Sequence, residues 1–382
     1  MSGWLCLIGE GGGRIYDVIP SSGRLYLCGH FSSNTFIGCL ANDGLVWFKS
    51  TPIPKVDGFI FNKLCGLRNV IAVSGSFILG FLDYSGVFRK CWATFELDGE
   101  YHVINDICCA EDFVVTCNED GLIVKASMDN VDGVAVSLES SGERNPLRLY
   151  SIYRSEGYAV AGSQLYYDNS ILMLLDEDFN VRWCIDFTET REGLGLTYPS
   201  TVCLSGGHVY VCATPPSVSC FSLEGSFLWG RMLTDGDPKL LEECTPSMAL
   251  DEEYLYLACS KYLVVLDRYS GGYVRGLEVN IEDGSAEISG VRAANGGLFI
   301  CGCSNAGGFI VFLPRENIGE VKLRGLKLRD ASSTLKLTEI HPNVRYINPI
   351  IEDEEPEFSV ETLPEFREER PKIVFYGDFP EA

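Results

Sequence analysis

The side chains best suited to acid–base or metal chemistry are scarce in this chain. Its four histidines are His30, His102, His208 and His341, and no two of them have the close spacing of a zinc motif. His30 follows a run of small residues, where it would face a channel, but a hydrogen-bonded or surface imidazole is the more usual role. The histidines therefore indicate neither a metal site nor a catalytic base.

Cysteine is abundant, with sixteen residues, and two groups are closely spaced: Cys108-Cys109 and Cys301-Gly302-Cys303. Alternate side chains of a strand share a face, so Cys301 and Cys303 point the same way, whereas the adjacent pair does not. Adjacent cysteines rarely bridge each other, because the required geometry strains the backbone. We interpret most cysteines as small, half-apolar side chains packed on strands, with disulfides or a metal role as alternatives.

Three further patterns approach functional motifs but lack essential parts. Residues 176–180 (Asp-Glu-Asp-Phe-Asn) carry oxygen ligands at alternate positions but lack the Gly and final Glu of a calcium loop, so we expect an exposed hairpin turn. Residues 9–13 (Gly-Glu-Gly-Gly-Gly) precede no helix that would hold a phosphate. No Gly-X-Ser-X-Gly nucleophile motif occurs. The sequence predicts no catalytic residue, no metal and no cofactor.

The elements that carry these residues repeat along the chain. A short β-rich run that ends in small residues occurs seven times, at Leu25–Gly29, Ile71–Gly75, Val114–Asn118, Ala159–Gly162, Val209–Ala213, Leu255–Cys259 and Leu298–Gly302. The small residues are separated by 46, 43, 44, 51, 46 and 43 positions when the following are treated as equivalent: Cys28, Ser74, Cys117, Ala161, Cys212, Ala258 and Cys301. This regular spacing is typical of a repeat fold.

Each run is followed by a second apolar run, a tight turn and then a strand that often contains tryptophan. Turns such as Asn42-Asp43-Gly44 supply the positive φ angles that hairpins need, and the tryptophans are Trp47, Trp92, Trp183 and Trp229. Each unit is therefore a meander of about four strands. Seven such units predict an all-β, seven-bladed β-propeller, in which small residues relieve crowding where the inner strands converge.

The hairpins around two tryptophans resemble a known class of repeat. Residues 42–47 (Asn-Asp-Gly-Leu-Val-Trp) and 223–229 (Leu-Glu-Gly-Ser-Phe-Leu-Trp) are similar to the PQQ-like repeats of WD40-like and quinoprotein-like propellers. The resemblance covers about residues 1–328, but repeats three, six and seven depart from the tryptophan pattern. It implies a propeller fold rather than one activity, because the class includes enzymes, scaffolds and assembly factors.

The two ends of the chain differ from the repeats. Residues 2–5 (Ser-Gly-Trp-Leu) are similar to the turn and tryptophan of the outer strands, so we predict that an N-terminal strand closes the last blade beside residues 320–328. The expected domains are a propeller at 1–328 and an acidic, Pro-containing C-terminal extension at 329–382, which we expect to be irregular apart from candidate strands at residues 332–337 and 372–376. Residues 352–369 of this tail contain nine acids and one base, Arg367.

Apolar residues are interleaved with the acids of the tail, which favours a protein-binding segment over a purely solubilising one. The partner-binding residues predicted from this pattern are Ile351, Glu354, Glu355, Phe358, Phe366 and Phe375. With 53 Asp and Glu against 30 Lys and Arg, the formal net charge is −23. This charge disfavours nucleic acid and would attract a basic protein or peptide.

The sequence also bears on localisation and source. The first residues lack the basic start and apolar core of a secretory signal, and no run approaches the ~20 apolar residues that cross a bilayer, so we expect a cytoplasmic protein without membrane insertion. A single Gln (Gln164) and five Met favour a thermophilic source, whereas a charged fraction of 22% favours the opposite.

These observations predict a non-catalytic scaffold that mediates protein–protein interaction as a subunit of a larger intracellular complex. The alternatives are a propeller enzyme that uses its central channel for a quinone- or metal-assisted reaction, and a structural component of a larger particle. If the tail binds the partner, deleting residues 345–382 should remove that partner and leave the melting temperature nearly unchanged.

Overall fold

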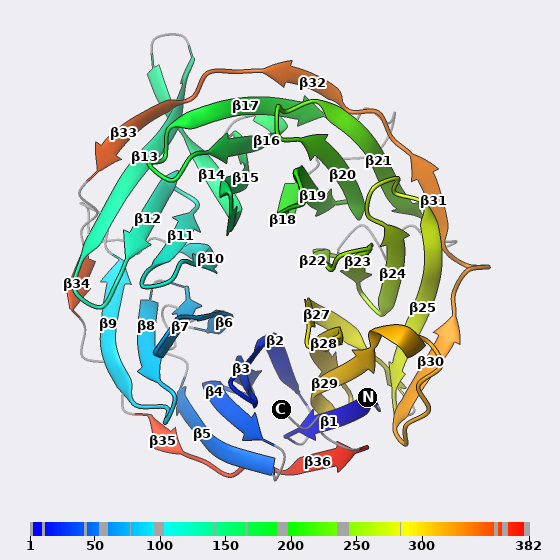
Figure 1. The fold of residues 1–382 in the computed structure, drawn as a ribbon. Coiled ribbons are helices and arrows are strands. Elements are labelled where there is room, and N and C mark those ends of the chain that lie inside the picture. The colour runs from blue at the N-terminus through cyan, green and yellow to red at the C-terminus, as the bar shows by residue number, and fades with distance from the viewer. Residues whose placement is uncertain are drawn as a thin grey trace. The chain divides into compact units, whose positions relative to one another are not determined.

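A computed structural model describes residues 3–9, 12–41, 44–52, 60–76, 78–94, 103–140, 143–164, 167–188, 198–234, 244–282, 284–354, 358–360 and 366–377. These residues form β-strands and one short 3-10 helix, η1 (Arg315–Asn317), and include no α-helix. The chain divides into two compact units, one with residues 1–91, 247–334 and 360–382 and the other with residues 92–246 and 335–359. Figure 1 labels the strands of both units.

The first unit consists of antiparallel meanders, each with a further strand from the tail. The first meander consists of β2 (Gly13–Ser21), β3 (Arg24–Phe31), β4 (Asn34–Ala41) and β5 (Gly44–Pro52). The second consists of β6 (Phe61–Gly66), β7 (Val70–Gly75), β8 (Ile78–Asp83) and β9 (Phe88–Thr94), and β9 reaches the border of the unit. The next is β22 (Ser247–Leu250), β23 (Tyr254–Cys259), β24 (Tyr262–Asp267) and β25 (Tyr273–Ile281), with the short β26 (Gly284–Ser285). In the last, β1 (Trp4–Ile8) follows β27 (Glu287–Ala294), β28 (Gly297–Ser304) and β29 (Gly307–Pro314).

The second unit has the same construction. One meander is β18 (Tyr198–Ser205), β19 (His208–Thr214), β20 (Ser217–Ser222) and β21 (Phe227–Thr234). A second meander consists of β10 (Ile104–Cys109), β11 (Val114–Asn118), β12 (Leu122–Ala126) and β13 (Val131–Ser140). A third consists of β14 (Glu143–Ser155), β15 (Gly157–Gln164), β16 (Tyr167–Leu175) and β17 (Val181–Thr188). The pairing of β13 with β14 joins these two meanders into one continuous sheet.

The seven runs named from the sequence are all strands. They lie in β3, β7, β11, β15, β19, β23 and β28, each the second strand of its meander. These strands are almost completely buried because apolar side chains on both faces pack against neighbouring sheets. The prediction of one β-meander per repeat is therefore confirmed for these runs.

The small residues of the repeats lie opposite bulges in the first strands of most meanders. In six meanders the first strand contains a bulge, and the residue that follows the register shift pairs with the small residue, as Asp17 does with Cys28 and Asp106 with Cys117. A bulge brings extra backbone against the neighbouring strand. A Cβ on Gly302 would lie 2.0 Å from the carbonyl oxygen of Glu287, and one on Gly29 would lie 2.1 Å from that of Arg14. A side chain is therefore excluded at Gly29 and Gly302, which directly follow the small residues Cys28 and Cys301.

The tail is more regular than expected, because short strands alternate with its prolines. They are β30 (Leu326–Asp330), β31 (Lys336–Glu339), β32 (Asn343–Tyr346), β33 (Ile350–Glu354), β34 (Phe358–Val360), β35 (Arg367–Glu368) and β36 (Ile373–Tyr376). Strands are present at the two candidate positions, as β31 and β36, but the expectation of an otherwise irregular tail was wrong, since backbone pairing to a folded sheet orders segments that could not fold alone. β30 also spans the border expected between residues 328 and 329.

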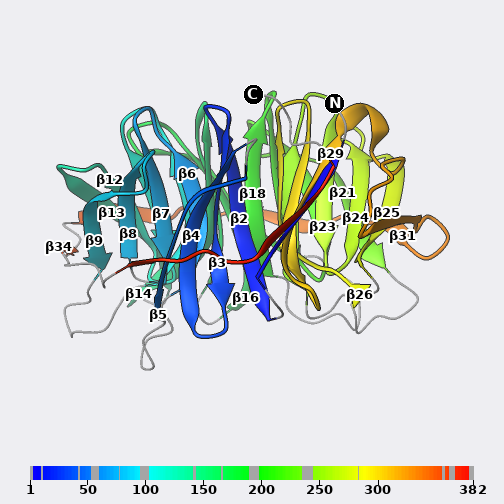
Figure 2. The ribbon, with the colours of Figure 1, turned by 90° about the horizontal axis from the view of Figure 1, so that it is seen from below.

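Each tail strand adds to the outer strand of a different meander, in the reverse of chain order. β30 pairs with β25, β31 with β21, β32 with β17, β33 with β13, β34 with β9, β35 with β5 and β36 with β1. Figure 2 shows β35 and β36, in red, crossing beside β5 and β1. An outer strand would otherwise present unpaired N–H and C=O groups, so the tail covers edges that favour aggregation.

The N-terminal strand joins the meander predicted for it but has other neighbours. β1 pairs with β29 on one side, with Trp4 opposite Phe312, and with β36 on the other, with Cys6 opposite Phe375. Residues 320–328, predicted beside it, instead contribute β30 to the sheet of β25.

Candidate protein-interaction site

The described tail residues among those predicted to bind a partner contact several different sheets of the chain. Ile351 is half-buried against the core of the second unit, and Glu354 ends β33 opposite Gly133. The ring of Phe366 lies between Phe61 and Phe88, with centroid distances of 5.9 and 4.8 Å.

The other three predicted residues are Phe375, Phe358 and Glu355. Phe375 packs against the apolar cluster around Trp4 in the first unit. Phe358 lies in β34, which pairs with β9, and Glu355 lies outside the described residues. Ile351, Phe366 and Phe375 therefore anchor the tail to its own sheets, which leaves the acids as its outward-facing part; Glu352 and Asp353 are exposed.

The histidines do not assemble a site among the described residues. His30 stacks on Tyr16 with ring centroids 5.4 Å apart, and burial, followed by the charge of Arg14, lowers its pKa. His208 is half-buried and its ring contacts the carbonyl of Gly206 at 2.8 Å, and His341 lies 3.6 Å from a Glu339 carboxylate oxygen. His102 lies outside the described residues, and no cluster of three metal-ligating side chains occurs within the described ranges.

Both interpretations of the cysteines hold, for different residues. Cys65, Cys109, Cys244 and Cys259 are disulfide-bonded, and the other twelve are free thiols. Burial raises the pKa of the Cys108 and Cys301 thiols, so these side chains stay protonated and act as apolar packing groups. Cys303 differs from the other free thiols in being only half-buried.

Residues 176–180 form the turn that was expected. The Asp176 carboxylate accepts hydrogen bonds from the backbone N–H groups of Asp178 and Asn180, at 2.9 and 2.8 Å. Phe179 adopts a φ of 62° in this turn, between β16 and β17. The alternating oxygens therefore shape a hairpin.

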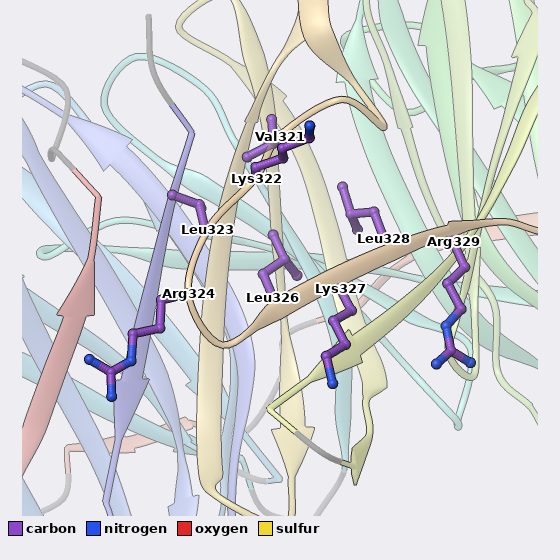
Figure 3. A pocket seen from close by; sticks show the side chains of 8 residues that line it. All are labelled: Val321, Lys322, Leu323, Arg324, Leu326, Lys327, Leu328 and Arg329. Atoms are coloured by element: carbon purple, nitrogen blue, oxygen red, sulfur yellow. The ribbon is translucent and has the colours of Figure 1, made fainter.

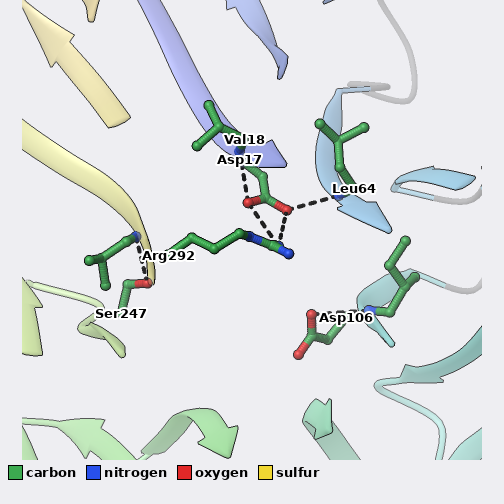
Figure 4. A network of polar contacts seen from close by, with 8 residues as sticks. Asp17, Val18, Leu64, Asp106, Ser247 and Arg292 are labelled. Atoms are coloured by element: carbon green, nitrogen blue, oxygen red, sulfur yellow. Dashed lines mark hydrogen bonds and ion pairs between the residues drawn. The ribbon is translucent and has the colours of Figure 1, made fainter. Parts of the chain in front are cut away.

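Polar side chains at the bulges connect adjacent meanders within the first unit (Figure 4). The Asp17 carboxylate of β2 accepts the Leu64 N–H of β6 at 2.9 Å, and the Arg292 guanidinium of β27 donates to both of its oxygens at 3.2 and 3.1 Å. The Ser247 hydroxyl accepts the Val291 N–H at 3.3 Å. The Asp17 carboxylate at the bulge of β2 and the Ser247 hydroxyl at the start of β22 therefore each satisfy an N–H of the next meander.

The second unit repeats this arrangement. The Asp106 carboxylate accepts the Ser151 hydroxyl at 2.6 Å and the Ile152 N–H at 3.2 Å. The Ser151 oxygen in turn accepts the Val202 N–H at 3.1 Å. Because buried N–H groups are costly to leave unpaired, this chain fixes three successive first strands relative to one another.

A second set of contacts lies at the outer strands and gives the tryptophans a function. Three of the four repeat tryptophans donate their indole N–H to the carbonyl that follows the third strand of the next meander: Trp47 to Tyr84 at 3.2 Å, Trp92 to Ser127 at 2.9 Å and Trp183 to Leu223 at 2.6 Å. Arg275 takes the equivalent place in β25 and donates to the carbonyl of Ile318. The repeated tryptophan is therefore a structural contact between meanders.

A basic groove is the surface feature that the sequence reasoning missed. It has a volume of about 570 Å³ and is formed by one segment of the first unit (Figure 3), lined by Val321, Lys322, Leu323, Arg324, Leu326, Lys327, Leu328 and Arg329. The four basic residues are exposed, whereas Leu326 is buried and the other apolar residues pack on the core around Leu277. The strict alternation of basic and apolar residues in this segment was the available signal.

The charge of the groove is only partly compensated by neighbours. No acid occurs between Glu320 and Asp330 in the sequence. Arg329 lies opposite Glu278 on β25, but Glu278 hydrogen-bonds Lys261 at 2.7 Å, and that contact is the main cause of its lowered pKa. Arg324 lies over the Tyr376 ring at 6.0 Å. The groove is thus a cationic surface on a chain of net charge −23.

No helix of the described residues combines the length and the apolar character needed to cross a membrane. No protein-family model and no curated protein sequence matches the chain. The similarity to solved structures is therefore one of fold.

Three solved propeller domains resemble the chain. The β-propeller domain of Myceliophteria thermophila Cps50 (Swd1) is 11% identical, with a TM-score of 0.54, and the match covers 78% of this chain and 99% of that domain. The WD40 β-propeller domain of Doa1 is 10% identical, with a TM-score of 0.54, and the match covers 82% of this chain and 98% of that domain. The Neurospora crassa Pan2 WD40 domain is 11% identical, with a TM-score of 0.51, and the match covers 79% of this chain and 90% of that domain. The all-β strands and this likeness show that the chain has a fold of the WD40-like β-propeller class.

Proposed function

We propose that this protein is a closed, seven-bladed β-propeller that acts as a non-catalytic scaffold for protein–protein interaction in a larger complex. The observation that carries the proposal is the basic groove at residues 321–329, in which exposed cations alternate with apolar side chains on a fixed strand. Charged and apolar groups in alternation suit recognition of a polypeptide, which offers both kinds of contact at the same spacing.

Blade number and closure are part of this proposal. They are supported by the seven repeated runs, each in the second strand of a meander, and by the pairing of β1 with β29. The contacts made by Asp17, Asp106 and the tryptophans tie each meander to the next within a unit. A surface held in this way loses little conformational entropy when a partner binds.

Several narrower statements remain predictions. They are the PQQ-like affinity of the repeats, the domain division at 328, and a basic partner for the six tail residues Ile351, Glu354, Glu355, Phe358, Phe366 and Phe375. Cytoplasmic localisation also stays a prediction, and it must be reconciled with the four disulfide-bonded cysteines, which are unusual in a reducing compartment.

Cross-linking and affinity purification from the source cells test the proposed function. The bait carries Lys322→Glu, Arg324→Glu and Lys327→Glu, and the matched control carries Arg68→Glu, Arg148→Glu and Arg182→Glu, which change the same charge at exposed positions outside the groove. We expect proteins cross-linked to the groove segment to be lost with the first variant and kept with the second. Equal recovery with both variants would contradict the proposal.

A further inference from the structure

We infer that the basic groove binds an acidic, extended segment of a partner protein as an additional strand beside β30. This inference rests on the proposed function and names the chemistry of the partner. It combines two observations: an open strand edge and the charge of the side chains that flank it.

The hydrogen bonds at the ends of β30 identify its open edge. Ala331 donates its N–H to Gly276, and Glu282 donates to Gly325. Hydrogen-bonded and non-bonded pairs alternate in an antiparallel ladder, so Arg329 and Lys327 bond to β25, whereas the N–H and C=O of Leu328 point away from it. Within the described residues, β30 pairs with β25 and has a single bridge to Leu323.

The side chains along this edge specify the charge of an added strand. Lys327 and Arg329 are exposed and are two residues apart, so they lie on one face of β30, as their head groups show in Figure 3. A strand paired to the open edge would place alternate residues beside them on that face. Carboxylates at positions i and i+2 of the partner would therefore meet both cations.

The rest of the groove adds to this preference. Leu328 is half-buried between the two cations, and an apolar residue at position i+1 would cover it on the opposite face. Lys322 and Arg324 extend the positive charge beyond the strand. The recognised segment is thus extended, with acids alternating with apolar residues, and is bound by main-chain hydrogen bonds together with charge pairing.

Fluorescence anisotropy with labelled ten-residue peptides tests the inference on the full chain. The probe alternates Glu and Val; the comparison peptides are one alternating Lys and Val, one of Glu alone, and the Glu–Val peptide with every second amide N-methylated. We expect binding of the Glu–Val peptide, at least tenfold weaker binding of both the N-methylated and the all-Glu peptides, and none of the Lys–Val peptide.

Protein variants separate the groove from the overall charge. Lys327→Glu with Arg329→Glu should lose at least tenfold affinity for the Glu–Val peptide and gain affinity for the Lys–Val peptide, with an unchanged circular dichroism spectrum. The control Arg148→Glu with Arg182→Glu should bind as the unchanged protein does.

Two results would overturn the inference. Equal binding of the all-Glu peptide or of a poly-dT oligonucleotide would show a general anion-binding surface, and equal binding of the N-methylated peptide would exclude strand addition. Loss of cross-linked proteins from the groove variant in cells, without binding of the Glu–Val peptide, would leave the scaffold proposal standing and reject only the acidic strand.

Discussion

Asp106 on β10 accepts a hydrogen bond of 2.6 Å from the hydroxyl of Ser151 on β14. The donor belongs to the first strand of the next meander, 45 residues later in the chain. The Ser151 oxygen then accepts an N–H from a third first strand, at Val202. One carboxylate therefore holds a series of meanders through successive first strands.

Removing the Asp106 carboxylate should lower the free energy of unfolding. Asp106→Ala leaves the Ile152 N–H and the Ser151 hydroxyl without their acceptor in a buried site, and we expect unfolding to become easier by about 2–4 kcal/mol. Asp112→Ala, at an exposed position, is the control and should change stability by less than ~0.5 kcal/mol. Urea denaturation measures the free energy of unfolding of both variants. Equal losses of stability would contradict the role of Asp106 in linking the first strands.

The indole hydrogen bonds can be tested with a pair of matched substitutions. Trp183 donates to Leu223 at 2.6 Å, whereas the Trp229 N–H meets no acceptor among the described residues, and the two side chains are 7% and 6% exposed. Trp183→Phe should destabilise by about 1 kcal/mol more than Trp229→Phe, because only the first loses a hydrogen bond. Thermal melting of the two variants gives the comparison; a reversed order would contradict it.

Truncation of the tail should weaken the fold. Deleting residues 343–382 removes β32 to β36 and uncovers five outer strands, so we expect a melting temperature lower by at least about 5 °C, with self-association on gel filtration. This is the opposite of the unchanged melting temperature expected from the sequence for deletion of residues 345–382.

A single substitution probes the same attachment. Phe366→Ala loses the stacking on Phe61 and Phe88 and should cost about 1–2 kcal/mol. Tyr346→Ala, at a tail residue that is 59% exposed, should have a smaller effect. If calorimetry finds both variants as stable as the unchanged protein, the tail does not contribute to stability.

Carboxylates at the hairpin turns should make stability fall in acid. The Ser85 hydroxyl, the Val87 N–H and Arg89 lower the pKa of Asp83 to about 2, and Asp176, Asp267 and Asp330 are shifted down by similar turn contacts. A folded pKa below the unfolded value stabilises the protein above about pH 4, and this stability is lost as the pH falls towards 2. Asp83→Asn should flatten the dependence over this range in chemical denaturation; an unchanged slope would contradict the assignment.

The thiols should differ in reactivity according to burial. Under native conditions Cys303 should be alkylated by iodoacetamide before the eleven buried free cysteines, because it is only half-buried and burial restricts access of the reagent to the others. Peptide mapping without reduction should find Cys65, Cys109, Cys244 and Cys259 protected. Uniform labelling of all sixteen would refute both assignments.

The repeat could be predicted from the sequence because each run around Cys28 and its equivalents combines apolar, strand-forming residues with compact side chains. The bulge opposite most of these residues could not be predicted, since a bulge depends on pairing between strands and leaves no mark in one strand alone. The role of Trp183 was likewise hidden, because its acceptor at Leu223 belongs to the next repeat.

The tail shows a different limit of sequence reasoning. Phe366 and Phe375 looked available to a partner because proline and acid content disfavour independent folding. A strand of two to five residues has too little apolar surface to fold alone, and its pairing depends on an edge elsewhere in the chain. The basic groove was readable as alternation at residues 322–329, yet the negative net charge directed attention away from it.

The position of β1 sets a constraint on biosynthesis. Its neighbours are residues 308–312 and 373–376, so Trp4–Ile8 leaves the ribosome long before either neighbour exists. At translation rates of about 5–20 residues per second, this apolar segment waits roughly 20–70 s for β36. Completion of its sheet therefore has to wait until residues 373–376 have been synthesised, and until then the segment is a natural client for chaperones.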